Sequence, residues 1–206
     1  SAVCEGSSSE VLTLIDYVGT IIRWESSVSP FTEWNIIEHT DETYVSDPIF
    51  ETTRFRAVVQ SGVCDMQESD YTEVTVKPIP SPIISTLDNL TYCEGDEFSV
   101  TFSVDITGDS YQWLLNGNAI EDAINSSYTA NIPGVYSVEV TIDDCTGLSN
   151  ELEIVANPIP NPTISSINSL IICGDEEILV EFTIDITSDS YQWLLNGDEI
   201  PEATNN

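Results

Sequence analysis

Asp109-Ser-Tyr-Gln-Trp-Leu-Leu-Asn-Gly117 decides the fold, because the same nine residues return unchanged as residues 189–197. The match extends on both sides with the same spacing of 80, so that Pro78-Ile-Pro80 falls on residues 158–160. A fixed period of this length is typical of tandem small domains. We therefore expect three related modules: a first module (1–77), a second module (78–157) and a truncated third module (158–206).

The first module looks different but shares the frame of the other two. A cysteine precedes a tryptophan by 20 residues in every module, and an aromatic residue precedes a second cysteine by nine in the first two. The cysteine–tryptophan pairs are Cys4–Trp24, Cys93–Trp113 and Cys173–Trp193, and the aromatic–cysteine pairs are Phe55–Cys64 and Tyr136–Cys145. The first module then differs mainly by an eight-residue insertion after Trp24.

Alternating apolar residues predict β-strands throughout the chain, and no segment predicts a helix. Residues 98–104 place Phe and Val on one face and Ser and Thr on the other, which is typical of a half-buried strand. Asn116-Gly117 predicts a type I′ hairpin turn. Strands are expected at 10–17, 20–24, 43–45, 53–59, 72–76, 98–104, 110–115, 128–130, 135–142 and 151–155, with a loop at 26–30. The predicted fold is all-β: tandem sandwiches joined by short Pro-rich linkers at 77–82 and 157–162.

The charge of the chain argues against two classes of binding partner. There are 36 acidic and four basic residues, which gives a net charge of -32, and no Lys or Arg follows Lys77. Such a surface argues against nucleic-acid binding and against docking on an anionic membrane. No apolar run approaches the roughly 20 residues of a membrane span, so no membrane insertion is expected. We interpret the charge as a solvated, self-repelling surface; the alternative is that the carboxylates loosely bind calcium.

The second module resembles an immunoglobulin-type sandwich. Trp113 stands where such domains carry the tryptophan of strand C, and Tyr136 stands at the tyrosine corner. Val100 and Val138 stand at the two positions of the usual inter-sheet disulfide, so apolar packing replaces it. Phe55 takes the corner position in the first module. The resemblance implies a core built on Trp24, Trp113, Trp193, Tyr136 and Phe55.

More narrowly, the chain resembles the Ig-like repeats of very large surface proteins of Bacteroidota, including gliding-motility adhesins exported by the type IX system. The motifs that carry this resemblance are Val3-Cys-Glu-Gly6, Arg23-Trp-Glu-Ser-Ser27, residues 55–62 with Cys64, and Tyr111-Gln-Trp113 with Asn116-Gly117. It implies a non-enzymatic, extracellular repeat segment that spaces a binding tip from the cell. Its partners would be neighbouring repeats, surface glycans or other surface proteins. The alternative is an accessory module that attaches a secreted enzyme to carbohydrate or protein.

Five cysteines in small secreted-type modules predict disulfides. One scheme pairs Cys4 with Cys64 and Cys93 with Cys145, and leaves Cys173 without a partner. In an Ig-type sandwich, however, the two positions of each such pair lie at opposite ends, roughly 20 Å apart, which is too far for a disulfide. The second scheme joins Cys4 to Cys145 across the module boundary. In that scheme Cys64, Cys93 and Cys173 would form disulfides with further modules that are missing or incomplete here. Both schemes stay open at this point.

No catalytic constellation or resident cofactor is expected. His39 is the only histidine and is expected on the surface. A His-dependent triad or metal site would therefore have to use this one residue. Asp143-Asp144 is interpreted as a turn, with a calcium site as the alternative. Trp34 is interpreted as a core residue, with an exposed sugar-stacking platform as the alternative.

Overall fold

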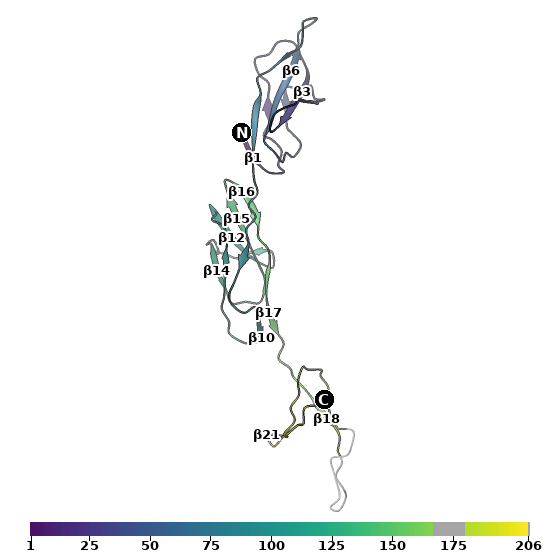
Figure 1. The fold of residues 1–206 in the computed structure, drawn as a ribbon, viewed down its shortest axis with the longest axis vertical. Coiled ribbons are helices and arrows are strands. Elements are labelled where there is room, and N and C mark those ends of the chain that lie inside the picture. Colours follow the sequence, from purple (N-terminus) through teal and green to yellow (C-terminus); the bar gives the residue numbers. More distant parts are fainter. Residues whose placement is uncertain (167–179, 206) are drawn as a thin grey trace, which may run out of the picture. The chain divides into compact units, whose positions relative to one another are not determined.

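The computed structural model describes residues 1–166 and 180–205 (Figure 1). Strands make up the regular structure of those residues; no helix occurs among them, and so none that is long and apolar enough to cross a bilayer. The chain forms two compact units, one of residues 1–90 with 97–155 and one of residues 91–96 with 156–206. The first unit contains almost all of the first and second modules.

The first module has one large and one small sheet. Its strands are β1 (Ala2–Cys4), β2 (Leu12–Thr13), β3 (Thr20–Val28), β4 (Asn35–Ile37), β5 (Thr43–Tyr44), β6 (Thr53–Gln60), β7 (Gln67–Glu68) and β8 (Thr72–Lys77). The large sheet has the order β1-β8-β6-β3-β4 with β7 beside β6, and the small sheet pairs β2 with β5. β1 runs parallel to β8, whereas the other pairs are antiparallel.

The second module is a sandwich of two antiparallel sheets. Its strands are β9 (Ile84–Ser85), β11 (Val100–Val104), β12 (Ser110–Leu115), β13 (Asn118–Ala119), β14 (Ser127–Ala130), β15 (Gly134–Ile142), β16 (Cys145–Leu148) and β17 (Leu152–Asn157). One sheet contains β17-β15-β12-β13 with β16 beside β15, and the other has the order β14-β11-β9. Three strands facing a sheet built on β12 and β15 is the arrangement of an Ig-like domain, so the predicted fold class is confirmed.

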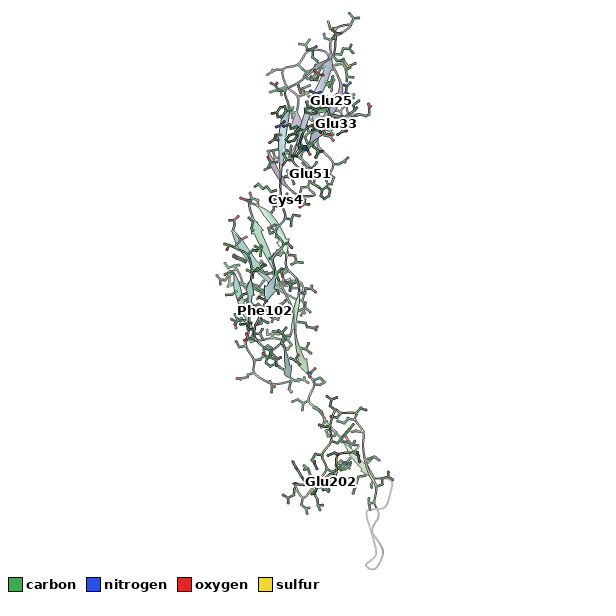
Figure 2. All side chains as sticks on the ribbon, in the orientation of Figure 1. Cys4, Glu25, Glu33, Glu51, Phe102 and Glu202 are labelled. Atoms are coloured by element: carbon green, nitrogen blue, oxygen red, sulfur yellow. A yellow bond between two sulfur atoms is a disulfide. The ribbon has the colours of Figure 1, made fainter. Side chains whose placement is uncertain are left out.

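The core of the second module is a cluster of aromatic rings between the sheets. Phe102 lies inside this module (Figure 2), with its ring centroid 6.0 Å from that of Trp113 and 5.1 Å from that of Tyr136. Val100 and Val138 are completely buried, as expected for positions that replace an inter-sheet disulfide. The Tyr136 hydroxyl donates to the Ile132 carbonyl oxygen at 2.7 Å, which is the hydrogen bond of a tyrosine corner.

The first module repeats this core with substitutions. Trp24 and Phe55 are buried, and Tyr44 contacts both rings, with centroid distances of 5.6 and 5.8 Å. Because Phe55 has no hydroxyl, the corner hydrogen bond is absent here. The remaining buried members of this core are Leu12, Ile21, Ala57 and Val74.

The second unit contains the described part of the third module. Besides β10 (Thr91–Cys93), which belongs to the second module, its elements are β18 (Ile164–Ser166), β19 (Phe182–Ile184), β20 (Leu194–Leu195) and β21 (Asp198–Glu199). Trp193 is half-buried, and its indole Nε1 donates to the Asn205 carbonyl oxygen at 2.7 Å. The indole of Trp113 donates to Asn125 in the same way, at 2.8 Å. The repeated sequence therefore adopts the same local structure twice.

Most predicted strands occur, but two expectations were wrong in their extent. The strand expected at 10–17 is reduced to Leu12–Thr13. The loop expected at 26–30 is partly strand, because β3 continues to Val28 by pairing with Thr53 of β6. For β3, pairing with a strand distant in the sequence therefore overrides the local pattern.

Candidate functional site

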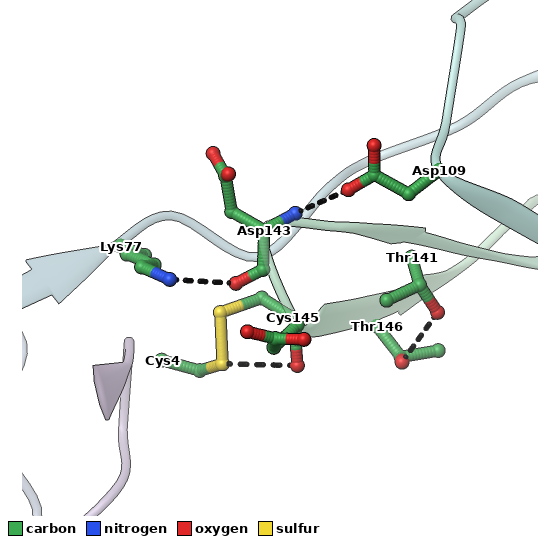
Figure 3. The surroundings of a disulfide bond; sticks show 8 residues. Cys4, Lys77, Asp109, Thr141, Asp143, Cys145 and Thr146 are labelled. Carbon is green, nitrogen blue, oxygen red and sulfur yellow. Dashed lines mark hydrogen bonds between the residues drawn. A yellow bond between two sulfur atoms is a disulfide. The ribbon is translucent and has the colours of Figure 1, made fainter. Parts of the chain in front are cut away.

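A disulfide bond joins the first module to the second. Cys4 ends β1 and Cys145 begins β16, and their Cα atoms lie 5.6 Å apart across a sequence separation of 141 (Figure 3). The tight turn between β15 and β16 brings Cys145 to the end of its module. Asp143 and Asp144 form that turn with φ values of 51° and 67°, a left-handed conformation that Asp tolerates.

Two polar contacts hold the same turn (Figure 3). Lys77 ends β8, and its ammonium Nζ donates to the Asp143 carbonyl oxygen at 2.9 Å. On the other side, the Asp143 amide donates to a carboxylate oxygen of Asp109 at 2.8 Å. Within residues 1–166 and 180–205, no group of three or more His, Cys, Asp or Glu side chains is placed to hold a metal ion. The arrangement is that of turn residues, as the sequence suggested for Asp143-Asp144.

The Pro-rich segment between the two modules packs against the β15–β16 hairpin. A Cβ atom added at Gly147 would lie 1.7 Å from the Pro80 carbonyl oxygen and 3.3 Å from a methyl group of Ile79. Only glycine leaves room for this approach. The segment that the sequence presented as a linker is therefore held by the second module itself.

The structure decides between the two cysteine schemes. The pair across the module boundary, Cys4–Cys145, is present, so the pairing of Cys4 with Cys64 and of Cys93 with Cys145 was wrong. Cys64 and Cys93 are free and exposed. Cys173 lies outside the described residues. The physical reason is the one expected from an Ig-type topology: the cysteines within one module lie at opposite ends of the sandwich.

A second candidate site is an arginine-rich face of the large sheet in the first module. β3 and β6 pair so that Glu25 stands opposite Arg56, on the face turned away from the core. The Glu25 carboxylate accepts from Arg56 at 2.7 Å and from Arg23 at 2.8 Å, although its side chain is only 6% exposed. Burial favours the neutral carboxylic acid, but the hydrogen bonds and charges of Arg56 and Arg23 together outweigh it and lower the pKa of Glu25.

Two aromatic rings stack on Arg54, another arginine of this face. The Arg54 guanidinium lies 3.8 Å from the centre of the Phe31 ring and 4.3 Å from that of Tyr71, and it pairs with Glu73 at 2.9 Å. Such stacking is worth about 0.5–1 kcal/mol at exposed sites. Three of the four basic residues of the chain are thus already paired with carboxylates, which makes this face rigid rather than strongly cationic.

Trp34 belongs to this face and not to the core. Its side chain is half-buried, and the Arg56 guanidinium lies 4.1 Å from the centre of its ring. The interpretation of Trp34 as a core residue was therefore wrong. β4 begins after Trp34 and pairs along the outer edge of β3, which leaves this side chain on the outer face.

Sequence reasoning missed the arginine-rich face, although a signal was present. In Thr53-Arg-Phe-Arg-Ala57 the arginines alternate with core residues, so both must lie on the outer face of one strand. The same alternation around the buried Trp24 places Arg23 and Glu25 on the outer face of β3, but only the pairing of β3 with β6 shows that Glu25 stands opposite Arg56.

His39 lies on the surface of a loop and has a structural contact. Its Nε2 lies 2.7 Å from the Thr43 carbonyl oxygen, and its ring is tilted against Tyr44 at a centroid distance of 5.2 Å. A carboxylate oxygen of the exposed Asp41 side chain lies 3.8 Å from the same Nε2 atom. These contacts fix the loop that precedes β5.

Comparison with known proteins found one matching family model and several solved structures of similar fold. Residues 1–78 match the model of a domain of unknown function, DUF8696. A comparison with curated protein sequences found no match. Among solved structures, the chain is similar to the N-terminal four Ig domains of Dscam1 isoform 6.9, at 16% identity and a TM-score of 0.34, covering 77% of this chain and 43% of that one.

Two further structures have similar scores. The fibronectin(III)-like modules of Clostridium thermocellum CbhA are 15% identical over 76% of this chain and 89% of that chain, with a TM-score of 0.34. A chain from the mouse coronavirus receptor-binding domain in complex with its murine receptor is 14% identical over 75% of this chain and 95% of that chain, with a TM-score of 0.38. The chain spans less than half of the Dscam1 structure. Its strand order, with the tryptophan and tyrosine-corner hydrogen bonds described above, makes it an all-β chain of Ig-like sandwiches.

Proposed function

We propose that this chain is a structural repeat segment of a long secreted surface protein, and that its disulfide limits how far the segment extends under load. Its Ig-like modules act as spacers that hold a binding tip away from the cell, and they have no enzymatic activity. Two observations support an extracellular location: a disulfide, which persists in oxidising compartments, and a highly acidic surface, which keeps an extended protein soluble.

The Cys4–Cys145 disulfide carries the proposal. A force applied to the two ends of the chain enters at residue 1, reaches Cys4 after three residues and passes directly to Cys145. Residues 5–144 then bear no tension, although they make up nearly the whole of two modules. Those modules cannot be extended while the bond is intact, whether or not they unfold.

The finer form of this proposal is an adhesin of the gliding-motility type, exported by the type IX system. It rests on the motif resemblance to Bacteroidota surface repeats, which includes residues 55–62 with Cys64. The partners would then be neighbouring repeats, surface glycans or other surface proteins. No resident cofactor is needed for such a role.

Single-molecule stretching between the two termini tests the load path. At about 3.5 Å per residue, residues 5–144 correspond to an extended length on the order of 500 Å. We expect this length to be missing from the extension of the oxidised chain and to appear after reduction. The double variant Cys4→Ser, Cys145→Ser is the control and should show the full extension without reductant. Equal extension with and without reductant in the unmodified chain would refute the mechanical role.

A second candidate function is carbohydrate or protein binding by the first module. The observation in its favour is Trp34, a half-buried ring on the outer face that is held in place by Arg56. Glycan-array binding that is lost in Trp34→Ala, and kept in Tyr71→Ala, would favour this function. If the unmodified chain bound no glycan on the array, the carbohydrate-binding function would be refuted and the mechanical role would remain.

A further inference from the structure

Residues 29–34, which connect β3 to β4, add aromatic rings to the arginine-rich face. In the second module only Asn116-Gly117 separates the corresponding strands, β12 and β13. The longer connection of the first module carries Phe31 and Trp34, whose rings stack on two arginines of β6. Phe31 has a φ of 64°, a left-handed conformation that is unusual for an aromatic residue. The insertion after Trp24 therefore builds a surface that is specific to the first module.

The sandwich itself does not require this surface. The four charged residues at the centre of the face flank the core residues Trp24 and Phe55 along β3 and β6. The second module has uncharged side chains at the four equivalent positions, namely Gln112, Leu114, Val135 and Ser137. It nevertheless forms a large and a small sheet around a buried tryptophan. The arginines and rings of the first module are therefore an addition to the fold.

Exposed apolar side chains surround the arginines. Ile36 stands opposite Glu25 on the edge strand β4, so both lie on this face, and Ile36 is 59% exposed. Tyr71, which stacks on an arginine, is 51% exposed. Met66 is the only methionine of the chain, and its Sδ accepts from the Arg23 guanidinium at 3.7 Å. Arginine, methionine and aromatic residues are the types that are enriched in protein–protein interfaces, so this face has the composition of a protein-binding surface.

The arginines of the face are held in place before any partner binds. Glu25 pairs with two of them and Glu73 with the third, and aromatic rings lie on two of the three guanidinium groups. Little side-chain entropy is then lost when a partner packs against them. The same pairing leaves the face almost neutral, because three arginines and two carboxylates sum to a charge of +1.

The charge of the chain indicates which partner fits this face. The chain carries a net charge of -32, and no Lys or Arg follows Lys77. Most contacts between two copies would therefore bring carboxylates together, and like charges in contact disfavour association. A contact between the arginine-rich faces of two copies avoids this repulsion, because the charges within each face are already balanced. It also removes aromatic and aliphatic side chains from water.

We infer that the arginine-rich face is a self-association surface, through which the first modules of two copies of this chain pair about a two-fold axis. Trp34, Ile36 and Tyr71 of each copy pack against the face of the other. The pairing goes beyond the spacer role, since it holds two segments side by side, and it rests on the protein-binding form of the second candidate function. One face of one small domain gives an interface at the low end of known sizes, so the dimer is weak and reversible.

Sedimentation equilibrium of the oxidised chain tests this inference. Thiols outside the Cys4–Cys145 bond are first blocked with iodoacetamide, so that no disulfide can link two copies. We expect a monomer–dimer equilibrium at millimolar concentration and below. Ile36→Asp, which adds a carboxylate to each face, and Tyr71→Ala should each weaken the dimer by about tenfold or more.

Val11→Asp is the matched control for the added charge. Val11 is 62% exposed and directly precedes β2 of the small sheet, away from the arginine-rich face. The control should therefore leave the dimer affinity close to that of the unmodified chain. Because Ile36 and Tyr71 are exposed as well, folding should tolerate both test variants, and their unfolding curves check this.

Ionic strength gives a second measurement that needs no variant. If two balanced faces pair, added salt should strengthen the dimer, because salt screens the repulsion between two chains that each carry a charge of -32. If the arginines of one copy instead bound carboxylates on the second module of another, added salt would weaken the association.

Four outcomes would overturn the inference: no association at millimolar concentration, equal dimer affinity in Ile36→Asp and Val11→Asp, growth beyond a dimer, or an association that salt weakens. None of them bears on the load path, because stretching measures a single chain. None bears on glycan binding either, which the array measures separately. A failed dimer test can therefore be distinguished from a failure of the proposed function.

Discussion

The Cα atoms of Cys4 and Cys145 lie 5.6 Å apart, although 141 positions separate them in the sequence. The bond connects the end of the first strand of one module to the β15–β16 hairpin of the next. It therefore closes a loop that contains the module boundary. This covalent topology distinguishes the chain from a string of independent sandwiches.

Alkylation under non-reducing conditions checks this topology. A thiol reagent should label Cys64 and Cys93, which are free and exposed, and should leave Cys4 and Cys145 unlabelled until the protein is reduced. Mass spectrometry of the digested, unreduced chain should contain a peptide pair that joins Cys4 to Cys145. A pair that joins Cys93 to Cys145 would contradict the structure.

Gly147→Ala should disturb the packing of the Pro-rich linker against the second module. The added methyl group would overlap the Pro80 carbonyl oxygen, so either the linker or β16 must move. We expect a loss of about 1–3 kcal/mol in the free energy of unfolding, measured by chemical denaturation. Leu148→Ala is the matched control, because the neighbouring Leu148 side chain is exposed and its truncation should change stability little. Equal stability of the two variants would show that the linker is not held at Gly147.

Glu25→Gln should remove the ionic centre of the arginine-rich face. The variant leaves Arg23 and Arg56 without their shared carboxylate, and we expect a loss of about 1–3 kcal/mol in the free energy of unfolding at pH 7. The control is Glu73→Gln, whose carboxylate is 40% exposed and which should cost about 0–1 kcal/mol. A larger effect for Glu73→Gln would contradict the assignment.

The same carboxylate should make stability depend on pH. The pKa of Glu25 in the folded chain lies below its ordinary value of 4.5, because hydrogen bonds from Arg56 and Arg23 outweigh the opposing effect of burial. Its stabilising contribution is then fully present above about pH 4.5 and is lost as the pH falls through the lowered folded pKa. Unfolding curves of the unmodified chain and of Glu25→Gln should therefore converge below pH 4.5. A constant difference down to pH 2 would contradict this expectation.

Tyr136→Phe should weaken the second module through a single hydrogen bond. The variant removes the donor to the Ile132 carbonyl oxygen and keeps the ring against Phe102. We expect a loss of about 1–3 kcal/mol, measured by thermal unfolding. Tyr128→Phe is the control, because its ring stacks on Trp113 while its hydroxyl has no hydrogen-bond partner among residues 1–166 and 180–205. If both variants lose the same stability, the corner hydrogen bond contributes nothing specific.

The sequence by itself determined the repeat, the strand-rich sandwich and the residues at its centre. Trp113, Tyr136 and the Asn116-Gly117 turn could be placed because alternation, turn chemistry and the period of 80 are local or periodic signals. These signals indicate which side of a strand a residue occupies. They do not indicate which distant strand lies beside it.

Only the tertiary structure decided the pairings between distant segments. It joined Cys4 to Cys145, placed Pro80 against Gly147 and brought Arg23 and Arg56 to Glu25. It also moved Trp34 from the expected core to the outer face. Each of these contacts depends on strand register and on which edge a neighbour covers, and both are set by the packing of the whole module rather than by any short stretch of residues.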